Sequence, residues 1–540
     1  MKKQLLRLII LIWLSTFFVY TKPSHAAEYI VTNCSDAGFT AVLSSIQSDP
    51  APEGTITFNC GIAEKTIDFS SPKLIIGRIT IDGGGAVVLS GMRATRLFEV
   101  QSDASLVLRN IILEKGIDLV GNGAAVNVNQ NASLHVSKSI LRQHRSGASG
   151  GAIHSYLGTV SLESSILEDN EAAYGGAIAQ NGGTLVLSDT QVLRNLATTG
   201  DGGGAQVWNA NSSFTFSIFD SNSALGDLGG AVSLRGGSTT ITGGYMNSNN
   251  ADSGGAIAAW DAAKLKLRYV TLGLNVATSN GGGIDAQDGS TLDLQYLTLQ
   301  GNLAYNGGAM HQGSGKASIL DSLFLLNKSS NGAGGALLLG IGSYDIQRSI
   351  FRQNAASNNA GGGIYSTGTL HLTNVQLEQN SSAAPGAGLR VVNSTAYLTN
   401  TTLYNNAGYG LSTRNVLTGS VILHNSILSR NTPSNCDGDL GDSSHRYSFS
   451  DDSSCAKLTG SSNQNNALLA FEAFDIQFGA QKLSIAVPVQ SAAAVDAIPL
   501  AACIPIDLRG SARPQGKACD AGAVERERQS FGVYLPLAIK

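Results

Sequence analysis

Apolar and polar residues alternate over short stretches along most of the chain. Residues 291–299 read Thr-Leu-Asp-Leu-Gln-Tyr-Leu-Thr-Leu, and residues 264–267 and 369–372 repeat the alternation. This is the period of a half-buried β-strand. Nowhere in the repeated region is there a run of ten or more residues with helical periodicity, which a helical repeat would need. The pattern predicts an all-β protein built from short strands.

An asparagine recurs about every 26 residues through the middle of the chain, at the end of an apolar-x-x-Asn phrase such as Phe351–Asn354. Five to eight residues later most copies carry Gly-Gly, a small residue and an aliphatic residue, as in Gly254–Ile257. A fixed period of this length indicates a solenoid, propeller or array. The recurring residues are Asn170, Asn195, Asn222, Asn249, Asn275, Asn302, Asn327, Asn354, Asn380, Asn406 and Asn431.

The length of the repeat selects among these architectures. A propeller blade needs roughly 40 residues, and the apolar spacing of leucine-rich repeats is absent. We therefore predict a right-handed, single-stranded parallel β-helix of about fourteen coils, each of about 26 residues, with strands stacked ~4.8 Å apart. Its ends are expected to carry disulfide-bonded caps.

The repeated asparagine is expected to form a structural ladder. Asparagine tolerates left-handed backbone geometry at a turn, and stacked amides can hydrogen-bond from coil to coil. The glycine pair is expected to supply positive φ. Counting back by one repeat places His144 in the asparagine position, and Gly116 in the position before it.

The N-terminus reads as a secretory signal peptide over residues 1–26. Lys2, Lys3 and Arg7 precede an apolar run over residues 8–20, and Ser24–Ala26 is a small-x-small cleavage site. An uncleaved membrane anchor is the alternative reading, although the apolar run is short for a span. The expected location is extracellular or at the cell surface.

Changes in periodicity divide the mature chain. Residues 27–60 are predicted to be an N-terminal cap with one short helix over 39–46 and a first strand over 55–58. Residues 61–435 hold the repeats, residues 436–525 a C-terminal cap and residues 526–540 a tail.

Six cysteines fall into three near pairs, and an even number in an exported chain implies disulfides. Fifteen connectivities are possible, and the three sequential pairs are favoured. No cysteine lies in residues 61–435, so the bridges are expected to hold the two ends, where a solenoid exposes strand edges. The favoured pairs are Cys34 with Cys60, Cys436 with Cys455, and Cys503 with Cys519.

Composition narrows the class of partner. The 540 residues include 64 glycines and 14% charged residues, with a formal net charge of −4 and no basic cluster. Nucleic acid is therefore not an expected partner. No cysteine–histidine spacing suggests a zinc site, and no metal or cofactor is predicted. The capped ends favour a monomer.

The repeats resemble those of the polymorphic outer membrane proteins, and the C-terminal region resembles that of secreted β-helix proteins with a choice-of-anchor module. The residues that carry the second resemblance are Asn435-Cys436, Asp451–Cys455, Ala494–Asp496, Asp507–Gly510, Arg513-Pro514 and Cys519–Glu525. The resemblance implies a secreted or surface-associated β-helix. Within the cap, we expect the acids and arginines of 507–525 to be tied together by bidentate ion pairs.

Candidate chemistry lies on the outer face of the strands that follow the glycine pairs. Counting from each pair by strand alternation predicts that Val207 and Asn209 face outward. The same counting gathers Trp260, Asp261, Asp285, Asp288 and His311 into one patch. Two carboxylates beside an aromatic suit sugar cleavage, so Asp261, Asp285, Asp288 and His311 are candidate catalytic residues. Tyr156, Trp260 and Tyr365 are candidate glycan contacts.

Three functions remain open at this stage. The sequence favours a noncatalytic adhesion protein that contacts a glycan or a surface, with extracellular polysaccharide or cell-surface components as partners. The alternatives are a polysaccharide lyase or glycoside hydrolase, with calcium implied only for the lyase, and a structural surface rod.

Overall fold

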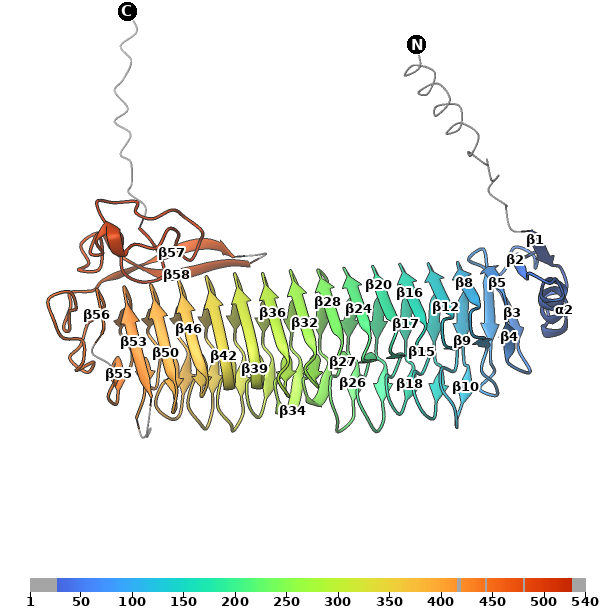
Figure 1. Cartoon of the computed structure of the whole chain (residues 1–540), viewed down its shortest axis with the longest axis horizontal. Helices are drawn as coiled ribbons and strands as arrows, with labels where there is room; N and C mark the ends of the chain where they lie inside the picture. Colours follow the sequence, from blue (N-terminus) through green and yellow to red (C-terminus); the bar gives the residue numbers. More distant parts are fainter. Residues whose placement is uncertain (1–26, 415–418, 442–443, 479–480, 527–540) are drawn as a thin grey trace, which may run out of the picture.

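The computed structural model describes residues 27–414, 419–441, 444–478 and 481–526 as one elongated parallel β-solenoid (Figure 1). The predicted signal peptide and residues 527–540 of the predicted tail lie outside the described residues. The all-β solenoid with one coil per repeat is confirmed. In the described part of the chain, no helix has the length and apolar character needed to cross a membrane.

Each turn of the solenoid contains up to four short strands. In a central turn these are β31 (Ile257–Trp260), β32 (Lys264–Arg268), β33 (Thr271–Gly273) and β34 (Val276–Asn280). Burial alternates along β32, whereas the first three residues of β31 are all buried. Each turn adds a layer of apolar side chains to one continuous core.

Equivalent strands of successive turns pair in parallel and form three sheets. Sheet A contains both β31 and β32, because β39 (Met310–Leu320) and β42 (Leu337–Gln347) run through both columns of strands without a break. Sheet B contains β33 and, among the described residues, sixteen strands in total, from β3 (Lys65–Asp68) to β56 (Phe449–Ser450). Sheet C contains β34.

The asparagine ladder runs between sheets B and C. Asn275 Oδ1 accepts hydrogen bonds from the backbone N–H and the Nδ2 of Asn249, each at 3.0 Å. Asn275 Nδ2 donates to Asn302 Oδ1 and to Met246 O, each at 3.0 Å. The amide thus satisfies buried groups on both neighbouring turns, which explains why the chain repeats asparagine here.

The left-handed residue of this turn is not the ladder asparagine, contrary to the sequence-based expectation. Leu274, which precedes Asn275, has φ +54°, and Arg194, which precedes Asn195, has φ +53°. The asparagine is therefore required for its amide rather than for its backbone tolerance. His144 does occupy the preceding ladder position, where its ring Nδ1 accepts from Gly116 N at 2.9 Å and its backbone N–H donates to Asn170 Oδ1 at 3.0 Å.

The two glycines of each pair have different roles. Gly254 has φ +65°, as expected for a turn that favours glycine. Gly255 does not have positive φ, but a Cβ there would lie 2.3 Å from Gly282 O of the next turn. Only glycine permits that approach of successive coils.

A short helix covers the N-terminal end of the solenoid. β1 (Glu28–Val31) leads into α2 (Asp36–Gln47), whose N-cap Ser35 accepts from Gly38 N, and β2 (Glu53–Phe58) follows. Phe39, Leu43 and Ile46 are the buried residues of α2. Helix and strand therefore form where the sequence predicts them, with the helix four residues longer and the strand two residues longer than expected.

The three disulfides are the sequential pairs that the sequence favours. They join Cys34 to Cys60, Cys436 to Cys455, and Cys503 to Cys519.

Part of the predicted C-terminal cap lies along the side of the solenoid rather than over its end. β57 (Phe471–Phe478) and β58 (Gln481–Pro488) form an antiparallel hairpin beside the last turns (Figure 1). Gln376 Nε2, on sheet B, donates to Ala486 O at 3.1 Å. Apolar side chains of the hairpin pack on sheet B residues such as Leu323 and Ile350. This packing keeps aliphatic side chains on the outer face of sheet B away from water.

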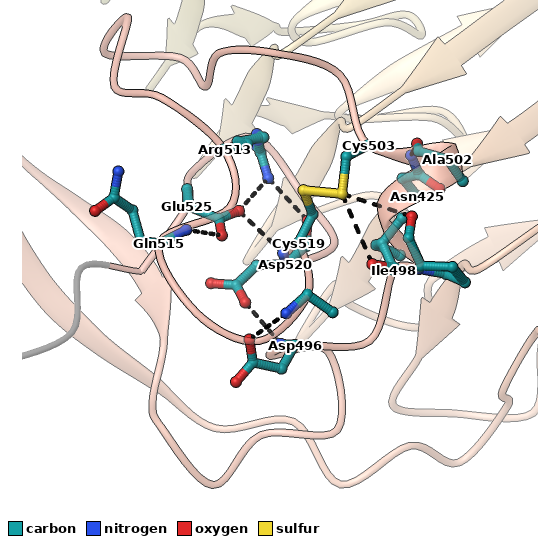
Figure 2. Close-up of a disulfide and its surroundings, with 12 residues drawn as sticks. Asn425, Asp496, Ile498, Ala502, Cys503, Arg513, Gln515, Cys519, Asp520 and Glu525 are labelled. Carbon is teal, nitrogen blue, oxygen red and sulfur yellow. Dashed lines mark hydrogen bonds and ion pairs between the residues drawn. A yellow bond between two sulfur atoms is a disulfide. The ribbon is translucent and has the colours of Figure 1, made fainter.

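A buried ion pair anchors the residues after the hairpin. Arg513 Nη1 lies 2.8 Å from Glu525 Oε2, and neither side chain is exposed. Figure 2 shows this pair beside the Cys503–Cys519 bridge. Arg513 also donates to the carbonyl oxygens of Asp520 and Gly522, each at 2.8 Å. The ion-paired cap expected from the sequence is thus present.

Candidate functional site

The structure brings three of the predicted patch residues together, but in a closed arrangement. Trp260 Nε1 donates to Asp285 Oδ2 at 3.1 Å, and His311 Nδ1 lies 2.6 Å from Asp285 Oδ1. Gln287 Nε2 donates to the same Oδ1 at 3.0 Å. Asp285 is fully buried, so both of its oxygens are engaged within the protein. The prediction that Asp285 is presented on an open outer face is wrong for that reason.

Asp261 and Asp288 occupy exposed turns beside this network. Their φ values are +58° and +53°, and Asp288 O accepts from Ala262 N at 3.1 Å, which places the two turns side by side. The carboxylate of Asp261 lies 3.6 Å from Arg235 Nη1. Asp261 therefore belongs with Arg235 rather than with Asp285.

The three predicted glycan contacts lie far apart along one stack of strands, and Tyr365 is in register with Ala258 rather than with Trp260. Tyr156 ends β15 (Ile153–Tyr156), and Trp260 ends β31, four strands further along sheet A. At the strand spacing this is about 19 Å. Tyr365, in β45 (Ile364–Ser366), lies four strands beyond β31. Tyr156 is exposed, whereas Trp260 and Tyr365 are half-buried.

One turn of this column has a different register from the predicted one. β19 (Ile178–Asn181) pairs with β23 (Ala205–Trp208), and Asn181 lies opposite Trp208. Val207 consequently faces the core and is buried, while Trp208 faces outward and is 47% exposed. The three consecutive glycines at 202–204 allow two alignments, and the slip of one residue reverses every side chain of the strand. The sequence-based alignment therefore missed Trp208.

A cleft lies beside Trp208 on this outer face. It has a volume of about 450 Å³, and we call it the Asp201 cleft. Its main polar and aromatic lining residues are Tyr174, Asp201, Trp208, Asp227, Arg235 and Asp261. They come from successive turns around β23 and β27 (Val232–Arg235).

Asp201 and Asp227 form a pair of neighbouring carboxyl groups on the cleft wall. Asp201 is only 2% exposed, and its Oδ2 accepts from Arg235 Nε at 2.6 Å. Asp201 Oδ1 receives no hydrogen bond from an N–H or hydroxyl group of the described residues. Burial, reinforced by the charge of Asp201 and a hydrogen bond to it, raises the pKa of Asp227 to about 6, against the opposing charge of Arg235. The pair therefore shares a proton in mildly acidic solution.

The remaining titratable side chain of the cleft is His154, which is neutral at pH 7. Burial, with a contribution from the charge of Arg96, lowers the pKa of His154 to about 4. Its Nδ1 lies 2.7 Å from Asn127 Oδ1. Among the described residues that line the cleft, Arg235 is consequently the only permanent cation.

The positions of Asp201 and Asp227 next to glycine pairs can be seen in the sequence, but both residues precede the strand positions that the sequence analysis compared. Asp201 directly precedes Gly202-Gly203, and Asp227 stands two residues before Gly229-Gly230. Counting only forward from the glycine pairs excluded both. The described residues contain no group of three or more His, Cys, Asp or Glu side chains placed to hold a metal ion.

No protein-family model matches the sequence, and no curated protein matches it. The resemblance to choice-of-anchor and polymorphic outer membrane proteins thus stays a prediction. Two solved structures are similar to this chain: the periplasmic alginate epimerase AlgG and a double mutant of the same enzyme. Each is 11% identical, with 76% of this chain and 81% of that chain covered, and the TM-scores are 0.24 and 0.27.

Proposed function

We propose that this protein is an exported β-solenoid that binds a polysaccharide chain along the outer face of sheet A without cleaving it, with the Asp201 cleft as the main contact. The observation that carries the proposal is Trp208, 47% exposed at the edge of a 450 Å³ cleft lined by polar side chains. A concave site with an aromatic surface and a few converging polar groups is the usual form of a small-ligand or sugar site.

The architecture suits an extended ligand. The interior is filled by side chains, so binding must occur on the surface. Tyr156, Trp208 and Trp260 lie at the ends of strands in the same column, two strands apart in each step. At the strand spacing each step is about 10 Å, which lets one chain contact several turns.

A noncatalytic role is supported by the state of Asp285. This predicted catalytic carboxylate is buried and already accepts hydrogen bonds from Trp260 and Gln287. Both of its oxygens are already engaged within the protein.

Export is the second part of the proposal. Three disulfides support folding in an oxidising compartment such as the periplasm or the extracellular space. Secretion by the predicted signal peptide and adhesion at the cell surface are proposed on the sequence.

The test is retention of the purified protein on a polysaccharide array, with release of new reducing or unsaturated ends measured in parallel. We expect retention without new ends, and about a tenfold or greater loss of affinity in Trp208→Ala. Phe216→Ala is the matched control, because Phe216 is 66% exposed in a turn outside the cleft. Absence of retention, or equal effects of the two variants, contradicts the proposal, and new ends would replace it by the enzyme alternative.

A further inference from the structure

The Asp201 cleft has an excess of negative charge. Three of its lining side chains are carboxylic acids, Asp201, Asp227 and Asp261, and Arg235 is the only described cation among its lining residues. Asp252, on β30 (Asn250–Ser253), adds its charge to the field at Asp227. Arg235 forms ion pairs with Asp201 at 2.6 Å and with Asp261 at 3.6 Å. One guanidinium group therefore pairs with two carboxylates.

One acceptor on the cleft wall depends on the proton that the two acids share. Asp201 is only 2% exposed, and among the described residues its Oδ1 receives no hydrogen bond from an N–H or hydroxyl group. Asp227 forms a hydrogen bond with Asp201 when it carries its proton. A ligand that brings both a positive charge and an N–H donor can replace that proton.

We propose that the Asp201 cleft recognises an amino sugar, with the protonated amine of one glycan unit donating to Asp201 Oδ1 and lying beside Asp227, while the sugar ring packs on Trp208. The inference rests on the proposed function and names its ligand class. The same charges repel uronates, because a ligand carboxylate would meet three acids and only one cation.

The surroundings of the two acids favour an amino sugar over a simple amine. The cavity is about 450 Å³, which far exceeds the volume that an ammonium group fills. Tyr174 and Trp208 are both exposed at its edge, so they can pack against a ring while the amine reaches the acids. Aromatic faces also attract cations.

Binding of a cationic ligand in the cleft should be coupled to release of a proton from Asp227. Asp227 holds its proton because of burial and the nearby charges of Asp201 and Asp252, with Arg235 opposing. An ammonium group beside Asp227 favours its ionised form. Proton release from the protein on binding is therefore expected near pH 6, and it can be measured by calorimetry in buffers of different ionisation enthalpy.

The decisive experiment compares three hexasaccharides with the purified full-length protein at pH 6: a glucosamine oligomer, its N-acetylated counterpart and a uronate oligomer. We expect the glucosamine oligomer to bind at least about tenfold more tightly than the N-acetylated one, and the uronate oligomer to bind most weakly. Asp227→Asn should reduce the preference for glucosamine to about twofold. Asp220→Asn, which removes the same charge from β25 (Ile218–Asp220) on sheet B, should leave it unchanged.

A second variant keeps the test valid if Asp227→Asn fails to fold. Asp261 is exposed in a turn, so Asp261→Asn should leave the fold intact and reduce the preference by a factor of about two to five.

Four results separate failure of this inference from failure of the proposed function. Equal or tighter binding of the N-acetylated or uronate oligomer, lost in Trp208→Ala, overturns the amino-sugar assignment but keeps the glycan-binding cleft. Preference for glucosamine that persists in both Asp variants also overturns it. Spermidine binding as tightly as the oligomer shows that an amine alone suffices and rejects the sugar. Binding of no glycan rejects the proposed function itself.

Discussion

Arg235 Nε lies 2.6 Å from Asp201 Oδ2, although 34 residues separate them in the chain. Asp201 stands in the loop before β23, and Arg235 ends β27 on the next turn. The ion pair therefore links two successive coils at the wall of the cleft. Burial and the charge of Asp201 raise the pKa of the neighbouring Asp227, and the positive charge of Arg235 opposes that rise.

This relationship predicts opposite effects of two substitutions on Asp227. Arg235→Gln removes an opposing positive charge and should raise the pKa of Asp227 above about 6, whereas Asp201→Asn removes a like charge and should lower it. The measurement is a carboxyl-carbon NMR titration of protein labelled at aspartate. Shifts in the same direction in both variants would contradict the described pair.

Removing one member of the asparagine ladder should destabilise the solenoid strongly. Asn275→Ala removes the acceptor of the buried backbone N–H of Asn249 and one of the two acceptors of its Nδ2, which still donates to Phe219 O, and it removes the side-chain donor to Met246 O. We expect a loss of about 2–4 kcal/mol in the free energy of unfolding. Thermal and urea unfolding of the variant should be compared with Asn211→Ala, which alters an exposed asparagine of β24 (Asn211–Thr215) and should change stability little.

The histidine in the ladder should make stability depend on pH. Burial lowers the pKa of His144 from 6.5 to about 3. Between these two pH values the unfolded chain binds a proton at His144 and the folded chain does not, so the free energy of unfolding falls as pH is lowered through this window, by up to about 1.4 kcal/mol per pH unit.

His144→Asn tests this linkage, because it supplies the amide found in the following turns. The variant should lose less stability than the unaltered protein between pH 6.5 and pH 4 in urea unfolding. His154 and the carboxylates are unchanged and contribute equally to both proteins. Identical pH dependence of the two would show that His144 is not buried in its neutral form.

The Arg513–Glu525 pair should hold the C-terminal residues against the solenoid. Arg513→Gln leaves the carboxylate of Glu525 buried without its cation, which costs about 3–5 kcal/mol. We expect earlier cleavage of residues 489–526 in limited proteolysis. Lys482→Gln is the control, because its ion pair with Asp475 is exposed and should contribute little. Equal protease resistance of both variants would argue against an anchoring role.

The sequence alone was sufficient for the parts of the molecule that repeat. A period of about 26 residues encodes which strand stacks on which, and the same period identifies the ladder from Asn170 to Asn431. The same period predicted the position of His144. The disulfide pairs are the three sequential pairs that the close spacing of the cysteines favoured among fifteen possible connectivities.

Only the tertiary structure determined the strand register and the burial of side chains where the repeat is irregular. The register at Gly202–Gly204 is chosen by core packing of Val207, which turns Trp208 outward. Whether Asp285 is open or enclosed depends on Trp260, a turn away in space.

The contacts of the cleft and of the hairpin likewise depend on the tertiary structure. Asp201 and Arg235 meet through the stacking of two coils, and β57 and β58 pack on a face of sheet B more than 100 residues earlier in the chain. A sequence repeat states the spacing of equivalent positions. It does not state the contacts between loops of unequal length or between distant segments, because those depend on burial and charge in three dimensions.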